Sequence, residues 1–255
     1  MSRNRLRKLP SIRSNTRICK GCWQQMHVPV PLRGPLSVPF RMFGIRRSRM
    51  NPNTCTVCEL MFTRVMKARK VKIDVSVMFA DLRGYTSLSQ SLPPDACSAL
   101  LDTFYDESAA AIWEYDGLLN KTIGDAVMAV FGFPIRHDDH PERAVEAARA
   151  IQRRCDARQA SLLAEVPGLL GTELGVGIGI DSGEVSFGEF GRAHRDLTAI
   201  GTVVNTAARA QSAAAAGGVL VTLAVHDRAL NAAHGSQGHA YHLKGYDQPI
   251  QLYAV

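Results

Sequence analysis

Past residue 72 the chain alternates short apolar runs of β-strand length with longer stretches of helical periodicity, and this alternation constrains the fold more than any other feature. In the helical pattern at 95–114 the apolar residues recur on one face, which predicts a helix packed against a sheet. Two apolar runs, 117–123 and 126–131, flank a Gly124-Asp125 dipeptide, the strongest short-range signal of a β-hairpin. Such a chain is predicted to form an α+β or α/β domain over residues 73–255.

The predicted elements follow one another in an order that selects a single architecture. In chain order we expect a strand at 75–80, a helix at 95–114, the hairpin, a helix at 141–160, strands at 175–180 and 184–187 joined by an Asp181-Ser182-Gly183 turn, a helix at 203–212, and short strands near 219–223, 239–243 and 249–254. The order β-α-β-β-α-β with appended strands is that of a ferredoxin-like sandwich. The fold class is therefore α+β, with one face of the sheet open.

Basic residues are concentrated at the start of the chain. Residues 1–72 hold 17 Lys or Arg and one acid, Glu59, for a net charge of +16, whereas residues 73–255 hold 13 Lys or Arg and 22 acids, for a net charge of −9. Residues 1–72 also lack a sustained helical or alternating pattern, and proline recurs through them. We therefore divide the chain into a basic N-terminal segment, 1–72, and a globular domain, 73–255.

Four of the six cysteines form two C-x-x-C pairs in the basic segment: Cys19 with Cys22, and Cys55 with Cys58. Four thiolates in this pattern suit a tetrahedral structural Zn²⁺, which would supply folding energy to a segment without a core. The 32 residues between the pairs exceed the usual spacing of zinc ribbons. An iron–sulfur cluster and free or redox-active thiols are the alternatives.

The cysteine pattern and the hydropathy also bear on localisation. Two C-x-x-C pairs are more typical of a protein in a reducing compartment than of one stabilised by a disulfide framework. The basic N-terminus is not followed by an apolar signal region, and no apolar run is long enough to span a bilayer. We expect a cytoplasmic protein, peripheral at the membrane if the basic segment adsorbs to anionic lipid. The positive charge of the basic segment also favours two other partners, nucleic acid and the acidic domain of this same chain.

Two carboxylates occupy positions that suit metal binding. Asp81 ends the first predicted strand, and Asp125 lies at the predicted hairpin tip. Turn preference alone explains either aspartate singly. If the two strands are neighbours, however, the side chains meet, and paired carboxylates suit Mg²⁺ because it takes oxygen ligands together with substrate phosphates.

Four sequence blocks, in this order, resemble the signature blocks of the class III nucleotidyl cyclases: FADLRGYT at 79–86, KTIGD at 121–125, GIGIDSGEV at 177–185 and TAIGTVVNTAAR at 198–209. The resemblance covers about residues 73–255, nearly a whole cyclase homology domain. Four spaced blocks are far more specific than one motif.

The resemblance implies roles for individual residues. Asp81 and Asp125 match the two aspartates that hold two divalent ions, Mg²⁺ or Mn²⁺, in each active site. Asn205 and Arg209, four residues apart on a predicted helix and so on one face, match the catalytic pair that orients the ribose and neutralises charge on the α-phosphate. A solvated helix face is the structural alternative for this pair.

Base selection and triphosphate binding are assigned to three further residues by the same resemblance. Lys121 matches the adenine-reading lysine, where guanylate cyclases typically carry Glu, and Thr198 matches the second selector of a bacterial adenylate cyclase subgroup. Lys244 matches the lysine that binds the triphosphate, with a solvent-facing strand-end lysine as its alternative. Arg192 and Arg195 lie where some members place a further phosphate-binding arginine and are left unassigned.

The resemblance further implies a homodimer in which Asp81 and Asp125 of one chain face the nucleotide-binding and catalytic residues of the second chain: Lys121, Thr198, Asn205, Arg209 and Lys244. The predicted function is that of an adenylate cyclase converting ATP to 3′,5′-cyclic AMP and pyrophosphate for intracellular signalling. A guanylate cyclase is the alternative enzyme, and Lys121 argues against it. The alternative from another class is a non-catalytic nucleotide-binding scaffold whose zinc-holding segment binds nucleic acid. The completeness of the expected set of site residues argues against that scaffold.

Overall fold

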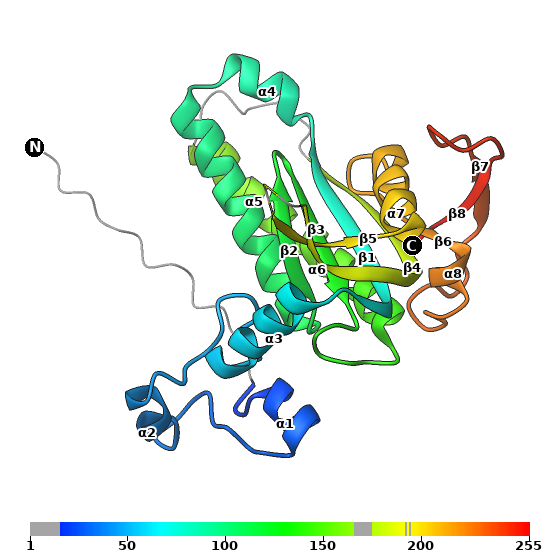
Figure 1. Cartoon of the computed structure of the whole chain (residues 1–255). Helices are drawn as coiled ribbons and strands as arrows, with labels where there is room; N and C mark the ends of the chain where they lie inside the picture. The colour runs from blue at the N-terminus through cyan, green and yellow to red at the C-terminus, as the bar shows by residue number, and fades with distance from the viewer. Residues whose placement is uncertain (1–15, 166–174, 192, 194) are drawn as a thin grey trace, which may run out of the picture.

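The protein is described by a computed structural model that covers residues 16–165, 175–191, 193 and 195–255. The strands within these ranges are β1 Val71–Arg83, β2 Leu118–Ile123, β3 Ala126–Phe131, β4 Gly175–Phe190, β5 Asp196–Ile200, β6 Val219–Thr222, β7 Gly238–Tyr241 and β8 Ile250–Ala254. They form one sheet in the order β2-β3-β1-β4-β6-β8-β7, with β5 paired to β4 beside this path (Figure 1).

The helices of the described residues are α1 Lys20–Met26, α2 Ser37–Met42, α3 Thr56–Ala68, α4 Tyr85–Ser91, α5 Pro94–Glu114, α6 His140–Glu165, α7 Thr202–Ala213 and α8 Leu223–His226. Helix α5, the hairpin of β2 and β3, α6 and α7 confirm the prediction. Together with β1 and β4 they give the β-α-β-β-α-β order of a ferredoxin-like domain, with β6, β7 and β8 appended. Among the described residues, no helix combines the length and the hydropathy that a bilayer crossing requires.

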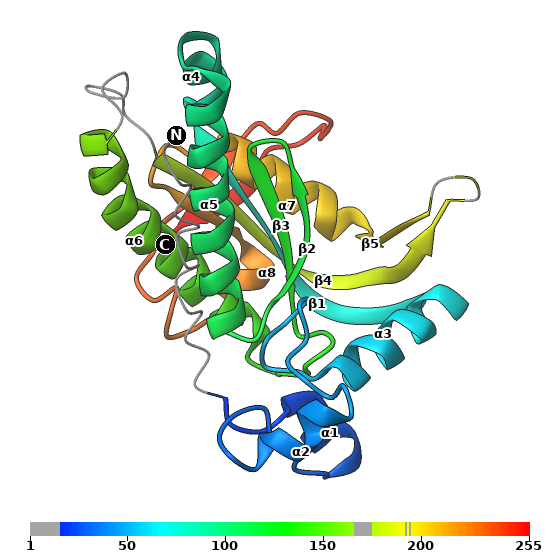
Figure 2. The same ribbon diagram turned by 90° about the vertical axis from the view of Figure 1, so that its left-hand side faces the viewer.

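Strand alternation divides the core into two layers, because successive side chains of a strand point to opposite faces of a sheet. Met78 and Ala80 of β1 pack against α5 and α6, whereas Val75 and Val77 face α3 and α7. Figure 2 shows α5 and α6 on one side of the sheet and α3 on the other. Asp81 has the same parity as Val75 and Val77, and this parity places it on the side of α3 and α7.

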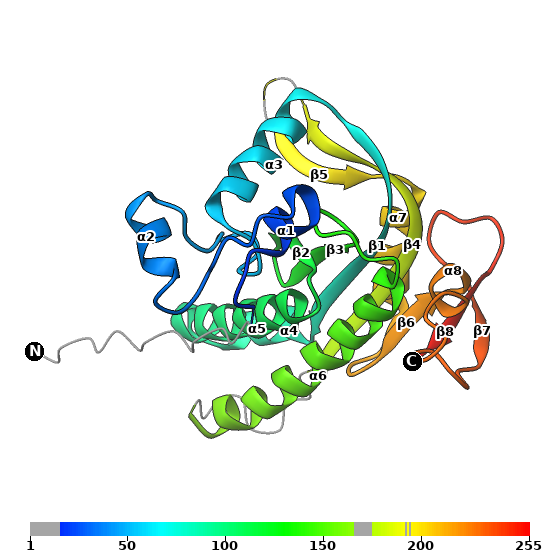
Figure 3. The same cartoon turned by 90° about the horizontal axis from the view of Figure 1, so that it is seen from below.

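The second face of the sheet is not open as expected, because helix α3 of the basic segment covers part of it. Met66 of α3 is buried there, and the Phe62 ring lies 5.9 Å from the Phe187 ring of β4 and 5.3 Å from the Phe133 ring. The segment therefore forms helices and packs on the domain that follows. Figure 3 shows α1, α2 and α3 together at one end of the sheet.

One predicted turn is wrong. The residues Asp181, Ser182 and Gly183 were expected to join two strands, but they lie inside a single 16-residue strand, β4. They pair with Val77, Ser76 and Val75 of β1 in an uninterrupted antiparallel register. Tertiary pairing overrides the turn preference, because the polar side chains find buried partners: Asp181 accepts from Thr222 Oγ1 at 2.6 Å, and Ser182 Oγ lies 2.6 Å from Ser76 Oγ.

A glycine explains how α7 comes so close to β4. A Cβ at Gly179 would overlap the backbone of α7 at Ala207 and Gln211. Any other residue would push the helix off the sheet, and with it the exposed face that carries Asn205 and Arg209.

Candidate functional site

The two predicted metal ligands lie side by side at one end of the sheet. Asp81 pairs with Ala126 of β3, the residue after Asp125, and the Leu82 amide donates to the Asp125 carbonyl oxygen at 3.0 Å. Asp125 is at the tip of the hairpin of β2 and β3, as the Gly-Asp dipeptide predicts. The carboxylates of two sequence-distant residues are thereby brought to one edge of the site.

The electrostatics of this pair fit a divalent cation. Burial, and then the negative charge of Asp125, raises the pKa of the Asp81 carboxyl, while the Arg83 guanidinium acts in the opposite direction. Arg83 Nη1 contacts Asp81 Oδ1 at 3.2 Å. Two converging, half-buried carboxylates repel each other, and they form a donor set of oxygens that suits Mg²⁺ or Mn²⁺.

Arg83 was not singled out from the sequence, although it belongs to the first signature block. Its guanidinium crosses β4 over Gly177, where a Cβ would collide with it, and it donates to the Gln211 carbonyl oxygen at the end of α7. The arginine therefore ties Asp81 to α7. The signal that could have found it is a long cation, Arg83, two residues after the aspartate, together with the glycine at position 177.

Lys121 lies on β2, and strand β5 runs beside it. The Lys121 ammonium is ion-paired with the Asp196 carboxylate, and Asn120 Nδ2 donates to the Leu197 carbonyl oxygen at 3.0 Å. Thr198 is two residues beyond Asp196 on the same strand and is half-buried. Side chains two residues apart on a strand share a face, so Lys121, Asp196 and Thr198 belong to one patch.

Asn205 and Arg209 share the exposed face of α7, as their spacing predicts. The opposite face of the helix is buried through Thr206, Ala207 and Ala210. Among the described residues, no hydrogen bond or ion pair involves the Arg209 guanidinium. The pair is thus available to a ligand or to a second chain.

Lys244 is exposed in the turn between β7 and β8. That turn rests against α7, because Tyr246 Oη lies 2.6 Å from Thr206 Oγ1, next to Asn205. Leu243 is buried in the cluster that also contains Ala210. The structure therefore brings the Lys244 turn to the helix that carries Asn205 and Arg209.

The predicted residues fall into three groups. Asp81 and Asp125 form one group, Lys121 and Thr198 on β2 and β5 form a second, and α7 with the Lys244 turn forms a third. Among the described residues, no hydrogen bond or ion pair joins the two aspartates to Lys121, Thr198, Asn205, Arg209 or Lys244. Arg195 is exposed and lies 3.6 Å from Glu189, and Arg192 falls outside the described residues.

Asp196, the ion-pair partner of Lys121, was not predicted from the sequence. Its pairing with Lys121 connects residues 75 positions apart, and the link depends on β5 folding back beside β2. The period-two spacing from Thr198 is the one local signal that could have pointed to it.

A second group of metal-ligating side chains lies in the basic segment. Cys19, Cys22, Cys55 and Cys58, which were predicted as a metal site, gather so that all four sulfur atoms are within 4.8 Å of one another. The first three are buried and the fourth is half-buried.

Comparison with known proteins identifies the domain. The adenylate and guanylate cyclase catalytic domain family matches residues 67–255. An uncharacterized protein of Mycobacterium tuberculosis is 36% identical over 183 residues, which cover 70% of this chain and 32% of that protein. An uncharacterized protein of Mycobacterium bovis is 34% identical over 186 residues, which cover 69% of this chain and 32% of that protein. The chain thus spans about a third of the length of these curated relatives.

Solved structures of both substrate classes share the fold. The adenylyl cyclase CyaB from P. aeruginosa has a TM-score of 0.68 at 28% identity, covering 73% of this chain and 95% of that chain. The guanylyl cyclase Cya2 has a TM-score of 0.65 at 26% identity, covering 72% and 92%. The guanylate cyclase domain of RhGC from Catenaria anguillulae, in complex with GTP, has a TM-score of 0.61 at 26% identity, covering 73% and 97%. The solved structures that share the fold therefore include both adenylyl and guanylyl cyclases.

Proposed function

This chain belongs to the adenylate and guanylate cyclase catalytic domain family, a family of nucleotidyl cyclases, and we propose that it is an adenylate cyclase. It would convert ATP to 3′,5′-cyclic AMP and pyrophosphate. The observation that carries the choice of ATP is the patch on β2 and β5, where the Lys121 ammonium lies beside the strand that bears Thr198.

The chemistry of the base supports adenine. An ammonium donates hydrogen bonds and accepts none, so Lys121 can donate to adenine N1 but offers no acceptor for the N1–H of guanine. The Thr198 hydroxyl can accept a hydrogen bond from the N6 amino group of adenine. A guanine in the same place would leave its N1–H unpaired and facing a positive charge, and unpaired polar groups at a binding site are costly.

Asp81 and Asp125 are the residues that would hold the divalent ions. Ions bound there would lower the pKa of the ribose 3′-hydroxyl and neutralise charge on the triphosphate. The fit rests on the donor set and on the raised pKa of Asp81, which a cation between the two carboxylates would relieve.

The remaining residues position the substrate and stabilise charge. Asn205 orients the ribose so that its 3′-oxygen points at the α-phosphorus, and Arg209 neutralises charge that develops on the α-phosphate. Lys244 binds the triphosphate. The ribose 3′-hydroxyl gives up its proton to solvent water, and its oxygen forms a bond to the α-phosphorus as the bond to the leaving pyrophosphate breaks. Catalysis then comes from orientation and from electrostatic stabilisation, with no covalent intermediate on the protein.

The site would be shared between two copies of the chain. In one copy, no hydrogen bond or ion pair among the described positions joins the aspartate pair to the substrate-binding residues. Two large apolar side chains near the patch are also exposed: Ile123 at the hairpin tip, with 50% of its surface accessible, and Ile200 at the end of β5, with 48%. A two-fold contact through such residues would bury them and complete two equivalent sites.

A charge reversal at Lys121 tests the proposal. We expect wild-type protein to have the higher kcat/KM with ATP, and we expect Lys121→Glu to lower the ratio of kcat/KM for ATP over GTP by about 100-fold, since charge-assisted hydrogen bonds contribute about 1.5–3 kcal/mol. Lys72→Glu, at an exposed position of β1, is the matched control and leaves the ratio unchanged. A wild-type preference for GTP, or an unchanged ratio in Lys121→Glu, would contradict the assignment.

A further inference from the structure

We propose that Cys19, Cys22, Cys55 and Cys58 hold one Zn²⁺, and that this ion fixes the basic segment on the cyclase domain through the buried carboxylate of Asp116. The proposal concerns a part of the chain that the cyclase chemistry does not use.

The geometry of the four sulfur atoms matches a single tetrahedral ion. The Sγ atoms of Cys19 and Cys58 are 3.6 Å apart, those of Cys22 and Cys55 are 3.5 Å apart, and those of Cys22 and Cys58 are 3.4 Å apart. Zinc bound to thiolates at about 2.3 Å places its ligands about 3.8 Å from one another. All six cysteines are free of disulfides. A cage of this size surrounds one ion and is too small for the several irons and sulfides of a cluster.

The backbone around the cage is built for thiolates. The amides of Cys22 and Cys55 both direct their N–H groups at Cys19 Sγ, at 3.4 Å and 3.2 Å. Gly21 lies so close to Cys58 that a Cβ there would come within 2.9 Å of its sulfur. Hydrogen bonds of this kind stabilise negative charge on a metal-bound sulfur and orient it.

The charge and the packing of residues 16–58 also favour a bound Zn²⁺. Residues 16–58 contain seven Lys or Arg and no Asp or Glu. One Zn²⁺ with four thiolates carries a net charge of −2, which this surplus of positive charge balances. The local core consists of Cys19, Cys22 and Cys55 with Val30 and Leu32. So small a core is unlike one that folds by apolar burial alone, and metal binding would supply the missing folding free energy.

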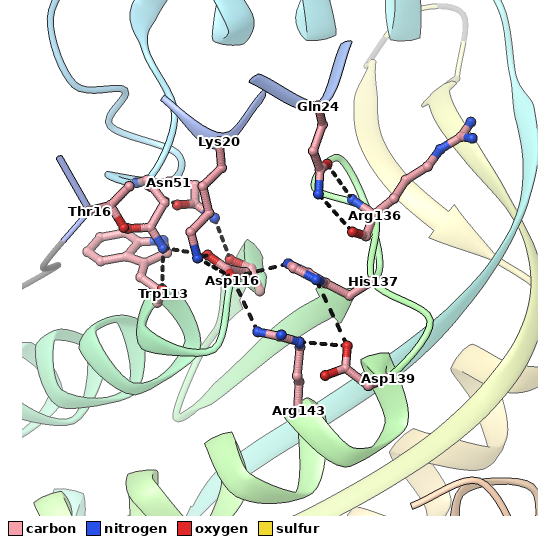
Figure 4. A network of polar contacts seen from close by, with 12 residues as sticks. Thr16, Lys20, Gln24, Asn51, Trp113, Asp116, Arg136, His137, Asp139 and Arg143 are labelled. Atoms are coloured by element: carbon pink, nitrogen blue, oxygen red, sulfur yellow. Dashed lines mark hydrogen bonds and ion pairs between the residues drawn. The ribbon is translucent and has the colours of Figure 1, made fainter. Parts of the chain in front are cut away.

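Residues beside the cysteines in sequence also hold Asp116, and Figure 4 shows Lys20 directed at this carboxylate. Lys20, between Cys19 and Cys22, places its Nζ 2.7 Å from Asp116 Oδ1, and Asn53, two residues before Cys55, donates to the same oxygen at 2.7 Å. The Asp116 side chain is fully buried, and His137 and Arg143 contact its other oxygen at 3.1 Å and 3.3 Å.

Further contacts surround this carboxylate. Asn53 also donates to the Trp113 carbonyl oxygen at 2.7 Å, and the Trp113 indole donates to the Met50 carbonyl oxygen at 2.8 Å. Asn51 donates to the Gly117 carbonyl oxygen at 3.0 Å. Asp116 and Gly117 join α5 to β2, the strand that carries Lys121. The residues around the zinc site therefore hold the start of β2 in place. Loss of the ion would release that corner and leave a buried carboxylate without two of its donors.

The first test is a metal analysis of the full-length chain, purified under reducing conditions without chelator. We expect about one equivalent of zinc per chain. After removal of the ion, added Co²⁺ should give the intense visible absorption of a tetrahedral tetrathiolate site. Less than about 0.2 equivalents of zinc, together with no uptake of added Zn²⁺ or Co²⁺ by reduced protein, would overturn the site. Iron as the stoichiometric metal would overturn its assignment to zinc.

Variants then locate the ligands. Cys55→Ser should lose the bound zinc, whereas Cys155→Ser, which changes a cysteine of α6 outside the cluster, should keep it. If Cys55→Ser does not fold, the Co²⁺ spectrum of the wild-type chain still decides the coordination. Full zinc retention in soluble Cys55→Ser would contradict the proposed ligand set.

Hydrogen exchange tests the docking separately. Removing zinc should speed amide exchange at residues 113–118 by at least about tenfold and leave residues 176–181, in the centre of the sheet, unchanged. Lys20→Met should keep its zinc and show faster exchange at 113–118. Equal exchange at 113–118 with and without zinc would overturn the link between the ion and Asp116. None of these readouts depends on cyclase activity.

Discussion

The Lys121 ammonium and the Asp196 carboxylate form an ion pair that joins β2 to β5 within one chain. Asp196 is about half exposed, and pairs of this kind contribute about 0.2–1 kcal/mol. We predict that Asp196→Asn raises the KM for ATP about two- to fivefold and changes kcat by less than about twofold, because the lysine loses the partner that holds its rotamer. Steady-state kinetics measure this split.

The kinetic result distinguishes a role of Asp196 in positioning Lys121 from a purely structural role. An Asp227→Asn variant, at an exposed position in the turn after α8, serves as control and should leave both constants unchanged. If Asp196→Asn lowered kcat and left KM unchanged, Asp196 would not act by holding Lys121.

Asp125 and Asp181 offer a matched contrast between a metal-binding and a structural carboxylate. We predict that Asp125→Asn lowers turnover by at least about 100-fold without a change in melting temperature, because an amide replaces a charged ligand at the half-buried hairpin tip. We predict that Asp181→Ala instead destabilises the fold by about 1–3 kcal/mol, since Asp181 is buried and its Oδ1 accepts from Thr222 and from the Ser182 amide.

Turnover per folded molecule and thermal unfolding distinguish these two cases. Full activity in Asp125→Asn would remove the metal assignment from the hairpin tip. Loss of activity in fully folded Asp181→Ala would show that β4 takes a direct part in the reaction.

The features that could be predicted from sequence are those fixed by local chemistry. Gly124-Asp125 between two apolar runs defined the hairpin and placed Asp125 at its tip, and the four-residue spacing of Asn205 and Arg209 placed both on one helix face. The convergence of Asp81 with Asp125 needed only that β1 and β3 be neighbours, which the ferredoxin-like order implies.

The features that were missed depend on contacts between distant parts of the chain. The predicted turn at Asp181-Ser182-Gly183 was wrong because Thr222 and Ser76, which are distant in sequence, supply hydrogen-bond partners that local turn preferences do not take into account. Helix α3 was not predicted, because prolines and arginines surround it in the sequence. Its apolar face can be recognised only from its packing against Phe187. The two cysteine pairs were visible in the sequence, but that all four sulfur atoms meet depends on the fold of the 32 residues between them.

Mixing two inactive variants tests whether the active site is shared between chains. Asp125→Ala and Arg209→Ala remove residues that we assign to opposite chains of a dimer. When the two are mixed and allowed to exchange subunits, half of the dimers should be mixed and should contain one intact site, so activity should recover to about a quarter of the wild-type value. No recovery, despite subunit exchange seen by a fluorescence assay, would place all the residues of a site in one chain.

His140 gives the fold a predictable pH dependence. It is buried: Arg228 lies 2.9 Å from its Nε2, and its Nδ1 lies 2.8 Å from Ser76 Oγ, a pattern that suits the neutral ring. Burial, and then the positive charge of Arg228, lowers the pKa of His140 from its ordinary value of 6.5, while Asp74 acts in the opposite direction. The unfolded chain therefore binds a proton more readily than the folded protein does.

It follows that the contribution of His140 to stability is complete above pH 6.5 and is lost as the pH falls through the lower pKa of the folded state. We predict that the free energy of unfolding falls between pH 7.5 and pH 5, and that His140→Gln has a flatter dependence, with a slope that differs by at most about 1.4 kcal/mol per pH unit. Denaturant titrations at several pH values measure the slopes. Parallel slopes for the two proteins would contradict the role given to His140.

The most direct test of the account is to incubate the full-length protein with ATP and, separately, with GTP, in Mg²⁺ and in Mn²⁺, and to identify the products by mass. Asp125→Asn, prepared in parallel, controls for a contaminating cyclase. The account predicts 3′,5′-cyclic AMP and pyrophosphate in equal amounts from ATP, with little or no cyclic GMP from GTP. Cyclic GMP as the main product, or bound nucleotide that is never cyclised under either metal, would contradict it.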